Sequence, residues 1–211
     1  MKLMILGATG AVGREVMAQA LASGRFAEVV APTRRPLPAH RGLVNPVWPM
    51  TVPLPDSPHW SVDGVICCLG TTLRKAGSRE AFRVVDETLV LAAARKAWEA
   101  GARTFVLNSS MGADPGAPAF YLQVKGRVEQ QLKDMDFERL VLVRPSLIDA
   151  EREEFRPAEW LGRKLSRVVR PLIPDRYKPV TPEAIAHAML AALEGPPGVE
   201  IIENAEIING G

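Results

Sequence analysis

Four residues near the middle of the chain could do proton chemistry at a carbonyl group. Ser109 and Ser110 close a short apolar run, and Tyr121 and Lys125 follow at the start of a helical stretch. Tyrosine and lysine at this spacing share one face of a helix, about one turn apart. The ammonium favours the phenolate form, which makes the hydroxyl a usable acid or base. A serine hydroxyl at the end of a strand could hold a substrate carbonyl oxygen beside it, because ligands bind at the carboxyl ends of strands in open α/β sheets.

The spacing from Tyr121 to Lys125 also occurs by chance, since both residue types are common on amphipathic helices. In that case Tyr121 is a partly buried packing residue and Lys125 is a charge in solvent. The catalytic interpretation is favoured when the pair follows a strand that ends in serines and the chain also carries a nucleotide-binding turn. The sequence therefore predicts a catalytic group of one serine, Tyr121 and Lys125.

The beginning of the chain carries such a turn. Lys2–Leu6 is a short apolar run, a glycine-punctuated stretch follows, and apolar residues then recur at helical spacing. Strand, tight turn and helix in this order begin a dinucleotide-binding βαβ unit, in which the glycines let the backbone approach a pyrophosphate at the helix N-terminus. Thr9 takes the second glycine position of the usual pattern, and a turn that only packs helix against strand is the alternative. The residues expected at the cofactor are Gly7, Thr9, Gly10, Ala11, Val12 and Gly13.

The end of the expected second strand indicates which cofactor would bind. Glu28–Ala31 leads into Thr33, Arg34 and Arg35, where proteins that bind NAD(H) place an Asp or Glu for the ribose 2′-hydroxyl. A guanidinium matches the geometry and charge of a phosphate, so these arginines favour a 2′-phosphate. A solvated loop with two arginines is the alternative. Coupled to the glycine turn, the pattern predicts NADP(H).

Short apolar runs alternate with amphipathic stretches along most of the chain. Such runs are typical of strands buried on both faces, and their alternation with helices predicts an α/β, Rossmann-like fold with a doubly wound parallel sheet. The expected strands are Lys2–Leu6, Glu28–Ala31, Val62–Leu69, Thr104–Leu107 and Leu140–Val143, and the expected helices are Gly13–Ser23, Ser78–Ala100 and Tyr121–Met135.

Two regions depart from this alternation. Prolines recur from Pro36 to Pro58 and exclude a long helix and most central-strand pairing, so an irregular connection with a short third strand near Val44–Val52 is expected. After Thr181, which caps a helix with Pro182 at its first position, Val199–Ile208 would form a small C-terminal extension of one or two short edge strands.

Composition bounds the class of protein. A chain of 211 residues with 47% apolar content and a net charge of +2 suits a single globular domain over residues 1–211 and gives no support to nucleic-acid binding. No segment is long and apolar enough for a membrane span, and the first apolar run leads into the glycine turn rather than a signal-peptide cleavage site. Cys67 and Cys68 are adjacent, which disfavours a mutual disulfide and fits strand packing in a reduced, cytoplasmic setting. Glu151–Lys178 suits a basic surface helix better than a membrane-bound one.

Together these stretches resemble the short-chain dehydrogenase/reductase superfamily, in particular the small atypical branch of the Tat-interacting-protein oxidoreductases and their bacterial relatives. The resemblance spans most of the chain and is weakest across residues 36–58 and after residue 197. The stretches that carry it are Gly7–Gly13, Cys68–Thr72, Ser109–Asp114, Phe120–Gly126, Arg144–Ser146 and Phe155–Trp160.

The resemblance implies roles for individual residues. Tyr121 would be the acid/base, and Lys125 would bind the nicotinamide ribose while tuning Tyr121. Ser110 aligns best with the substrate-orienting serine, with Ser109 as the alternative. The remaining cofactor contacts would be Arg34 and Arg35 at the 2′-phosphate, Leu69, Gly70 and Thr71 on the adenine–ribose side, and Pro145 and Ser146 on the nicotinamide side.

The function that the resemblance implies is an NADPH-dependent oxidoreductase for a small carbonyl or quinone-like substrate. Few residues follow the sixth strand, in contrast to extended members of the superfamily, so a nucleotide sugar would have little protein to hold it. The second hypothesis is an NADP(H)-bound sensor or interaction protein with little turnover, which small atypical members also resemble. Residues 147–179 are expected to form a substrate-side or lid segment. A homodimer is compatible with the sequence, which leaves the oligomeric state open.

Overall fold

Seven strands, all paired in parallel, form the centre of the molecule. The computed structural model describes residues 1–149 and 174–210. The sheet has the order β3-β2-β1-β4-β5-β6-β7, so the chain reverses its direction across the sheet between β1 and β4. The strands are β1 (Lys2–Leu6), β2 (Glu28–Val30), β3 (Leu43–Val44), β4 (Gly64–Cys67), β5 (Thr104–Asn108), β6 (Arg139–Arg144) and β7 (Gly198–Glu203). The predicted single α/β domain with a Rossmann-like parallel sheet is confirmed.

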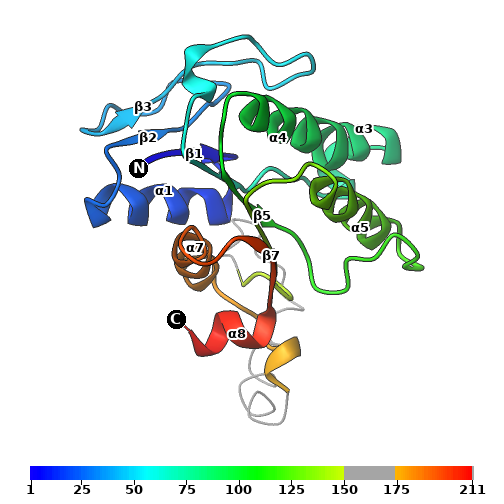
Figure 1. Cartoon of the computed structure of the whole chain (residues 1–211). Coiled ribbons are helices and arrows are strands. Elements are labelled where there is room, and N and C mark those ends of the chain that lie inside the picture. Colours follow the sequence, from blue (N-terminus) through cyan, green and yellow to red (C-terminus); the bar gives the residue numbers. More distant parts are fainter. Residues whose placement is uncertain (150–173, 211) are drawn as a thin grey trace, which may run out of the picture.

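Helices cover both faces of this sheet (Figure 1). One face carries α1 (Ala11–Ser23) and α7 (Pro182–Ala191), and α8 (Asn204–Asn209) follows the last strand. The opposite face carries α3 (Arg79–Arg83), the π-helical turn η2 (Val84–Leu89), α4 (Val90–Glu99) and α5 (Phe120–Lys133). The other short elements among the described residues are η1 (Pro58–Trp60), α2 (Leu73–Ala76) and η4 (Asp175–Tyr177).

The core consists of two layers, one on each side of the sheet. Successive strand side chains point to opposite faces, so Leu3 and Ile5 of β1 pack toward α1 and α7, whereas Met4 and Leu6 pack toward α4 and α5. All four side chains are fully buried. This two-sided burial is why the strands appear in the sequence as continuous apolar runs rather than as alternating ones.

The stretch Ser78–Ala100, expected as one helix, is divided by the π-helical turn η2. The Ser78 hydroxyl accepts from the backbone N–H of Ala81 and caps α3 at its start. The wider turn then lies between Val84 and Leu89, before α4 continues to Glu99. The buried residues of this turn are Asp86, Glu87 and Leu89. Turns of this kind are frequent at functional sites.

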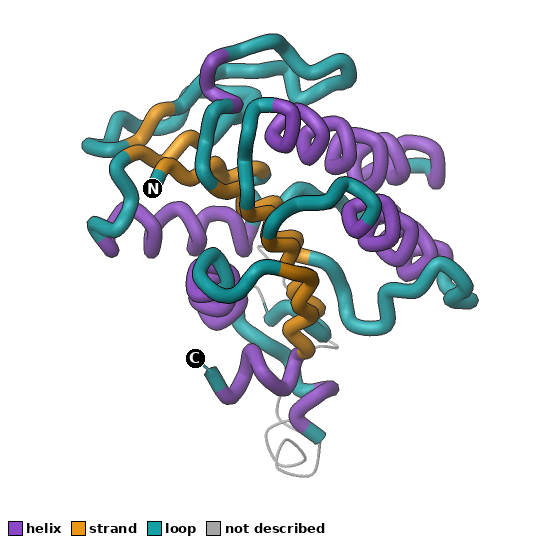
Figure 2. The backbone as a smooth tube through the Cα atoms, in the orientation of Figure 1, coloured by secondary structure: helices purple, strands orange, loops and turns teal. Residues whose placement is uncertain are grey.

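The proline-rich connection contains a shorter and earlier third strand than expected. The strand is Leu43–Val44, and the only later pairing is a single bridge from Val47 to Thr33. Trp48 and Trp60 pack their rings 5.0 Å apart and are both buried, so this connection has a small apolar core of its own that merges with the sheet. Figure 2 shows the connection as loop apart from β3 and the short helical turn η1.

The end of the chain forms one edge strand, as expected, but the segment after it is a helix rather than a second strand. Thr181 caps α7 through its hydroxyl, which accepts from Ala184 N–H at 3.2 Å, as expected. The segment expected as Val199–Ile208 becomes β7 and then α8, because Glu203 and Glu206 form a capping box that begins a helix. The expected basic helix around Trp160, and residues 150–173 of the expected lid segment, lie outside the described residues.

Candidate active site

The carboxyl ends of β1, β4, β5 and β6 bring the predicted site segments to one edge of the sheet. Backbone hydrogen bonds continue past the strands and hold the segments side by side: Cys68 N–H donates to Leu6 O at 2.8 Å, Ser109 N–H to Val143 O at 2.8 Å, and Met111 N–H to Pro145 O at 2.9 Å. The glycine turn, the Leu69–Thr71 segment, the two serines and Pro145 therefore occupy one continuous edge, where open α/β sheets bind ligands.

The glycine turn leaves no room for side chains at its first and last glycines. Gly7 has a φ of +81°, and a Cβ there would lie 2.7 Å from the carbonyl carbon and oxygen of Cys68. A Cβ on Gly13 would collide with the carbonyl oxygen of Gly7. Gly10 caps α1 with extended backbone, and neither a capping side chain nor an acidic residue occupies the first turn. The unpaired N–H groups at this helix start fit the pyrophosphate of a dinucleotide.

In the turn after β2, the Thr33 side chain is buried and holds the turn in shape, whereas the side chains of Arg34 and Arg35 are exposed to solvent. The Thr33 hydroxyl donates to Arg35 O at 2.6 Å and accepts from Asn45 Nδ2 at 2.8 Å, and the side chain is buried. Asn45 also donates to Ala31 O at 2.6 Å, so it fixes the turn against β3. Arg34 and Arg35 are exposed, and their guanidinium groups are free to meet a phosphate at this end of β2.

Tyr121 and Lys125 lie on one face of α5, and the Lys125 side chain is buried rather than exposed to solvent. Lys125 is 4% exposed and Asp86 is 1% exposed. The Lys125 Nζ lies 3.0 Å from Asp86 Oδ1 and 5.9 Å from the centroid of the Tyr121 ring. The Tyr121 ring in turn packs on Phe82, 5.8 Å away between centroids. The expected face-sharing pair is thus present, with a buried carboxylate added to it.

Burial and charge act in opposite directions on this ion pair. Burial acts to lower the pKa of Lys125, but the Asp86 carboxylate, with smaller contributions from Tyr121 and Cys67, raises the pKa above its ordinary value. Burial raises the pKa of Asp86, against the opposing effects of Lys125 and the Thr71 N–H. Lys125 is therefore held as an ammonium, which is the form that a ribose hydroxyl and a tyrosine hydroxyl both require.

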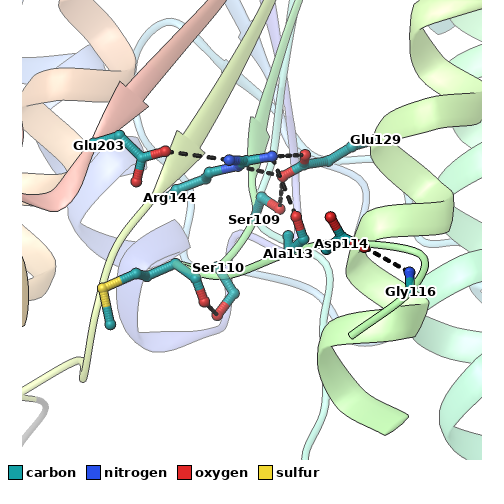
Figure 3. Close-up of polar contacts among 9 residues, drawn as sticks. Ser109, Ser110, Ala113, Asp114, Gly116, Glu129, Arg144 and Glu203 are labelled. Carbon is teal, nitrogen blue, oxygen red and sulfur yellow. Dashed lines mark hydrogen bonds and ion pairs between the residues drawn. The ribbon is translucent and has the colours of Figure 1, made fainter. Parts of the chain in front are cut away.

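The two serines after β5 have different surroundings (Figure 3). The Ser109 side chain is buried and donates to Glu129 Oε1 at 2.5 Å. The Ser110 side chain is partly exposed, lies apart from that network, and has one long contact of 3.4 Å to Met111 O. The Ser110 hydroxyl is therefore the one that remains available for another partner.

Arg144 links the serine loop to α5 and to the last strand. Its guanidinium donates to Glu129 through Nε at 3.1 Å and through Nη2 at 2.5 Å, to Ala113 O at 3.3 Å and to Glu203 Oε1 at 3.2 Å (Figure 3). Glu129 is 2% exposed and lies one helical turn beyond Lys125. We call Ser109, Glu129 and Arg144 the Glu129 cluster; it joins the ends of β5 and β6 to α5.

The segment after β6 is fixed by the region near the end of the chain. Ser146 donates through its hydroxyl to Lys178 O at 2.6 Å, and its backbone N–H donates to Asn204 Oδ1 at 2.8 Å. Asn204 Nδ2 also donates to the carbonyl oxygens of Asp175 and Lys178, both at 2.9 Å. Pro145 and Ser146 are thus held at the sheet edge on the side where the nicotinamide is expected.

The adjacent cysteines fit the packing role expected from the sequence. Both are free thiols, and burial raises the pKa of Cys67 to about 11 and raises that of Cys68 as well. Thiols that stay protonated are poor nucleophiles and poor metal ligands. Among residues 1–149 and 174–210, no group of histidine, cysteine and acidic side chains has the arrangement of a metal site.

Asp86 and Glu129 are site residues that the sequence analysis missed. Asp86 lies within the apolar stripe of its helix, between Phe82 and Leu89, and Glu129 lies between Val128 and Leu132. A carboxylate on a buried helix face must be paired with a cation or a hydrogen-bond donor. That position on the apolar face was the available signal, and Lys125 and Arg144 are the partners that it required.

The parallel sheet order and the glycine turn define a Rossmann-like α/β protein. No family model matches the chain. The chain is 35% identical to protein HTATIP2 of Rattus norvegicus, over 98% of this chain and 88% of that protein, and 32% identical to the mitochondrial protein FMP52 of Eremothecium gossypii, over 99% and 96%. The protein belongs to this HTATIP2/FMP52 family.

Solved structures show the same fold at low sequence identity. A short-chain dehydrogenase family protein from Francisella tularensis is similar with a TM-score of 0.66 and 14% identity, over 98% of both chains. MoeE5, in complex with UDP-glucose and NAD, is similar with a TM-score of 0.69 and 14% identity, over 99% of this chain and 80% of that chain. In the part of the chain that is described, no helix is long and apolar enough to cross a membrane.

Proposed function

We propose that this protein is an NADPH-dependent oxidoreductase that reduces a small carbonyl or quinone-like compound. The observation that carries the proposal is the place of the Lys125 ammonium: buried, beside the Tyr121 ring, and 3.8 Å from where a Cβ on Gly70 would lie. An ammonium held between a candidate acid and the expected cofactor segment is the arrangement that a reductase of this class needs. The family membership and the NAD complexes of similar folds support a nicotinamide cofactor.

The residues at the sheet edge would divide the work of the reaction. The glycine turn and the start of α1 would bind the pyrophosphate, and Lys125 would bind the nicotinamide ribose. The bound cofactor would supply the hydride. Ser110 would donate a hydrogen bond to the substrate carbonyl oxygen, and Tyr121 would give its proton to the alkoxide that forms there. Solvent then returns a proton to the Tyr121 phenolate.

The proposed NADPH preference rests on the exposed arginines after β2. We expect NADP(H) to bind at least about tenfold more tightly than NAD(H), as one charge-assisted contact worth about 1.5–3 kcal/mol would give. Calorimetric titration of both cofactors into the wild-type protein measures the ratio. The double variant Arg34→Ala/Arg35→Ala should bring the two affinities together by weakening NADP(H) alone. Equal affinities in the wild type would contradict the preference.

Turnover is tested by NADPH oxidation against a set of aldehydes, ketones and quinones. Substrate-dependent oxidation supports the reductase. Tight cofactor binding without turnover for every compound favours the second function, a cofactor-bound sensor or interaction protein, because the cofactor site would then be intact while the chemistry is absent.

We also propose a reducing compartment for this protein, since both cysteines are free thiols. The cytoplasmic location expected from the sequence stays a prediction, because the fungal relatives are named as mitochondrial proteins while the rat relative is not.

A further inference from the structure

Asp86 is a buried carboxylate that the proposed reaction does not use. It lies on η2, and its two oxygens have partners in two different parts of the site. Oδ2 accepts from the backbone N–H of Thr71 at 2.8 Å, and Oδ1 lies 3.0 Å from Lys125 Nζ. Thr71 belongs to the segment expected along the adenine–ribose side of the cofactor, and Lys125 belongs to the catalytic helix. One side chain therefore joins the cofactor segment to the proposed catalytic lysine.

The surroundings of Asp86 leave it little freedom to take other partners. Phe82, one turn earlier, is fully buried against Tyr121 and Phe120. A Cβ on Gly70 would approach Asp86 Oδ1 to 3.2 Å, so the backbone of the cofactor segment passes directly over the carboxylate. The neighbouring Glu87 is also buried but has a separate set of partners, because it pairs with Arg83 and Arg127.

The ion pair controls both the position of the Lys125 ammonium and the pH up to which this side chain stays charged. The titratable groups that interact electrostatically with Lys125 include Asp86 from η2, Tyr121 from its own helix, Cys67 from β4 and the adjacent Cys68. Asp86 is the carboxylate among them, and it forms the ion pair with Lys125. Without it, a buried ammonium has no opposite charge to balance its loss of hydration, so burial lowers the pKa of Lys125.

We propose that Asp86 is a positioning residue, which holds the Lys125 ammonium against the Leu69–Thr71 backbone so that cofactor binding and proton donation by Tyr121 share one fixed geometry. This role rests on the proposed function, because it assigns work to the same site. It predicts that loss of the Asp86 charge affects cofactor affinity and the pH dependence of turnover together.

The test compares Asp86→Asn with the wild type and with Glu87→Gln as the matched control. Asparagine keeps the shape and the acceptor for Thr71 N–H but removes the charge. We expect NADPH affinity at neutral pH to fall about tenfold in Asp86→Asn, as the loss of a charge-assisted arrangement gives. The alkaline limb of the reduction rate should move to lower pH by about one unit, because the pKa of Lys125 falls when the Asp86 charge is removed. Glu87→Gln should leave both quantities within about twofold of the wild type, because Glu87 pairs with Arg83 and Arg127 rather than with Lys125.

A second comparison, made in a Lys125→Met background, tests the role of Asp86 even if Asp86→Asn alone folds poorly. In a Lys125→Met protein the ammonium is absent, so adding Asp86→Asn should change NADPH affinity by less than about twofold. The neutral pair should also be at least as stable to heat as Lys125→Met alone, which leaves the carboxylate buried without a cation. An additive loss of affinity in the double variant would show that Asp86 does not act through Lys125.

The results separate this role from the proposed function. If the wild-type protein binds NADPH but reduces no compound, and Asp86→Asn still weakens NADPH binding, the proposed reductase function is wrong. The role of Asp86 in holding Lys125 for cofactor binding is then still supported. If the wild type is active and Asp86→Asn lowers only the thermal stability, with unchanged NADPH affinity and pH profile, Asp86 has a purely structural role. That result would overturn the proposal.

Discussion

Replacement of Tyr121 by phenylalanine should lower turnover by a factor of about 10²–10⁴, the usual contribution of a positioned general acid, while NADPH affinity stays unchanged. The variant keeps the ring, and with it the packing on Phe82 at 5.8 Å, and loses only the hydroxyl. Lys125→Ala should reduce turnover and affinity together, because the ammonium would serve both the ribose and the tyrosine. Steady-state rates with the best substrate of the screen and calorimetry with NADPH measure the two effects.

Tyr177 provides the matched control for this experiment. The chain has two tyrosines, and Tyr177 is 50% exposed on η4. Tyr177→Phe should leave turnover and affinity as they are in the wild type. A Tyr121→Phe protein with full activity would remove Tyr121 from the mechanism and leave only the cofactor site.

The parts of the site that the sequence predicted best are those whose chemistry is local. The turn from Gly7 to Gly13 could be recognised because close backbone approach excludes any side chain there, and that requirement appears directly as glycine. The spacing of Tyr121 and Lys125 was equally readable, since helical geometry places such residues on one face. The parallel sheet followed from continuous apolar runs, which only two-sided burial explains.

The parts that the sequence did not predict depend on contacts between distant segments. Asp86 meets Lys125 across 39 positions of the chain, and Glu129 meets Ser109 and Arg144 from a third element. The π-helical turn changed which residues of Ser78–Ala100 face the core, and no local pattern indicates such a turn. The segment Val199–Ile208 has the apolar content of a strand throughout. The capping box of Glu203 and Glu206 nevertheless begins a helix in its second half.

Replacement of Glu129 by leucine should cause the largest loss of stability among substitutions at the site edge. The change leaves the Ser109 hydroxyl and the Arg144 Nε without their acceptor inside the protein. Removing one partner of a buried pair costs about 3–5 kcal/mol, and the lower end applies here because Arg144 keeps Glu203. For a chain of this length, about 3 kcal/mol corresponds to a fall in Tm of about 6–12 °C in calorimetry.

Glu203→Gln is the control, because it removes the other carboxylate of Arg144 at a position where the side chain is 47% exposed. That pair is close to a surface ion pair, so its loss should cost less than about 1 kcal/mol and lower Tm by no more than about 4 °C. If Glu129→Leu and Glu203→Gln are equally stable, the burial of the Glu129 cluster contributes nothing.

The double variant Glu129→Leu/Arg144→Met separates stability from positioning. Replacing both charges by apolar side chains leaves neither one unpaired, so at least half of the lost stability should return. Turnover of the double variant should nevertheless be lower than in the wild type. Arg144 no longer donates to Ala113 O, so the loop that carries Ser110 loses its link to α5. Recovery of stability together with full turnover would mean that the β5–α5 loop holds Ser110 in place without the Glu129 cluster, and that Glu129 serves only to balance the charge of Arg144.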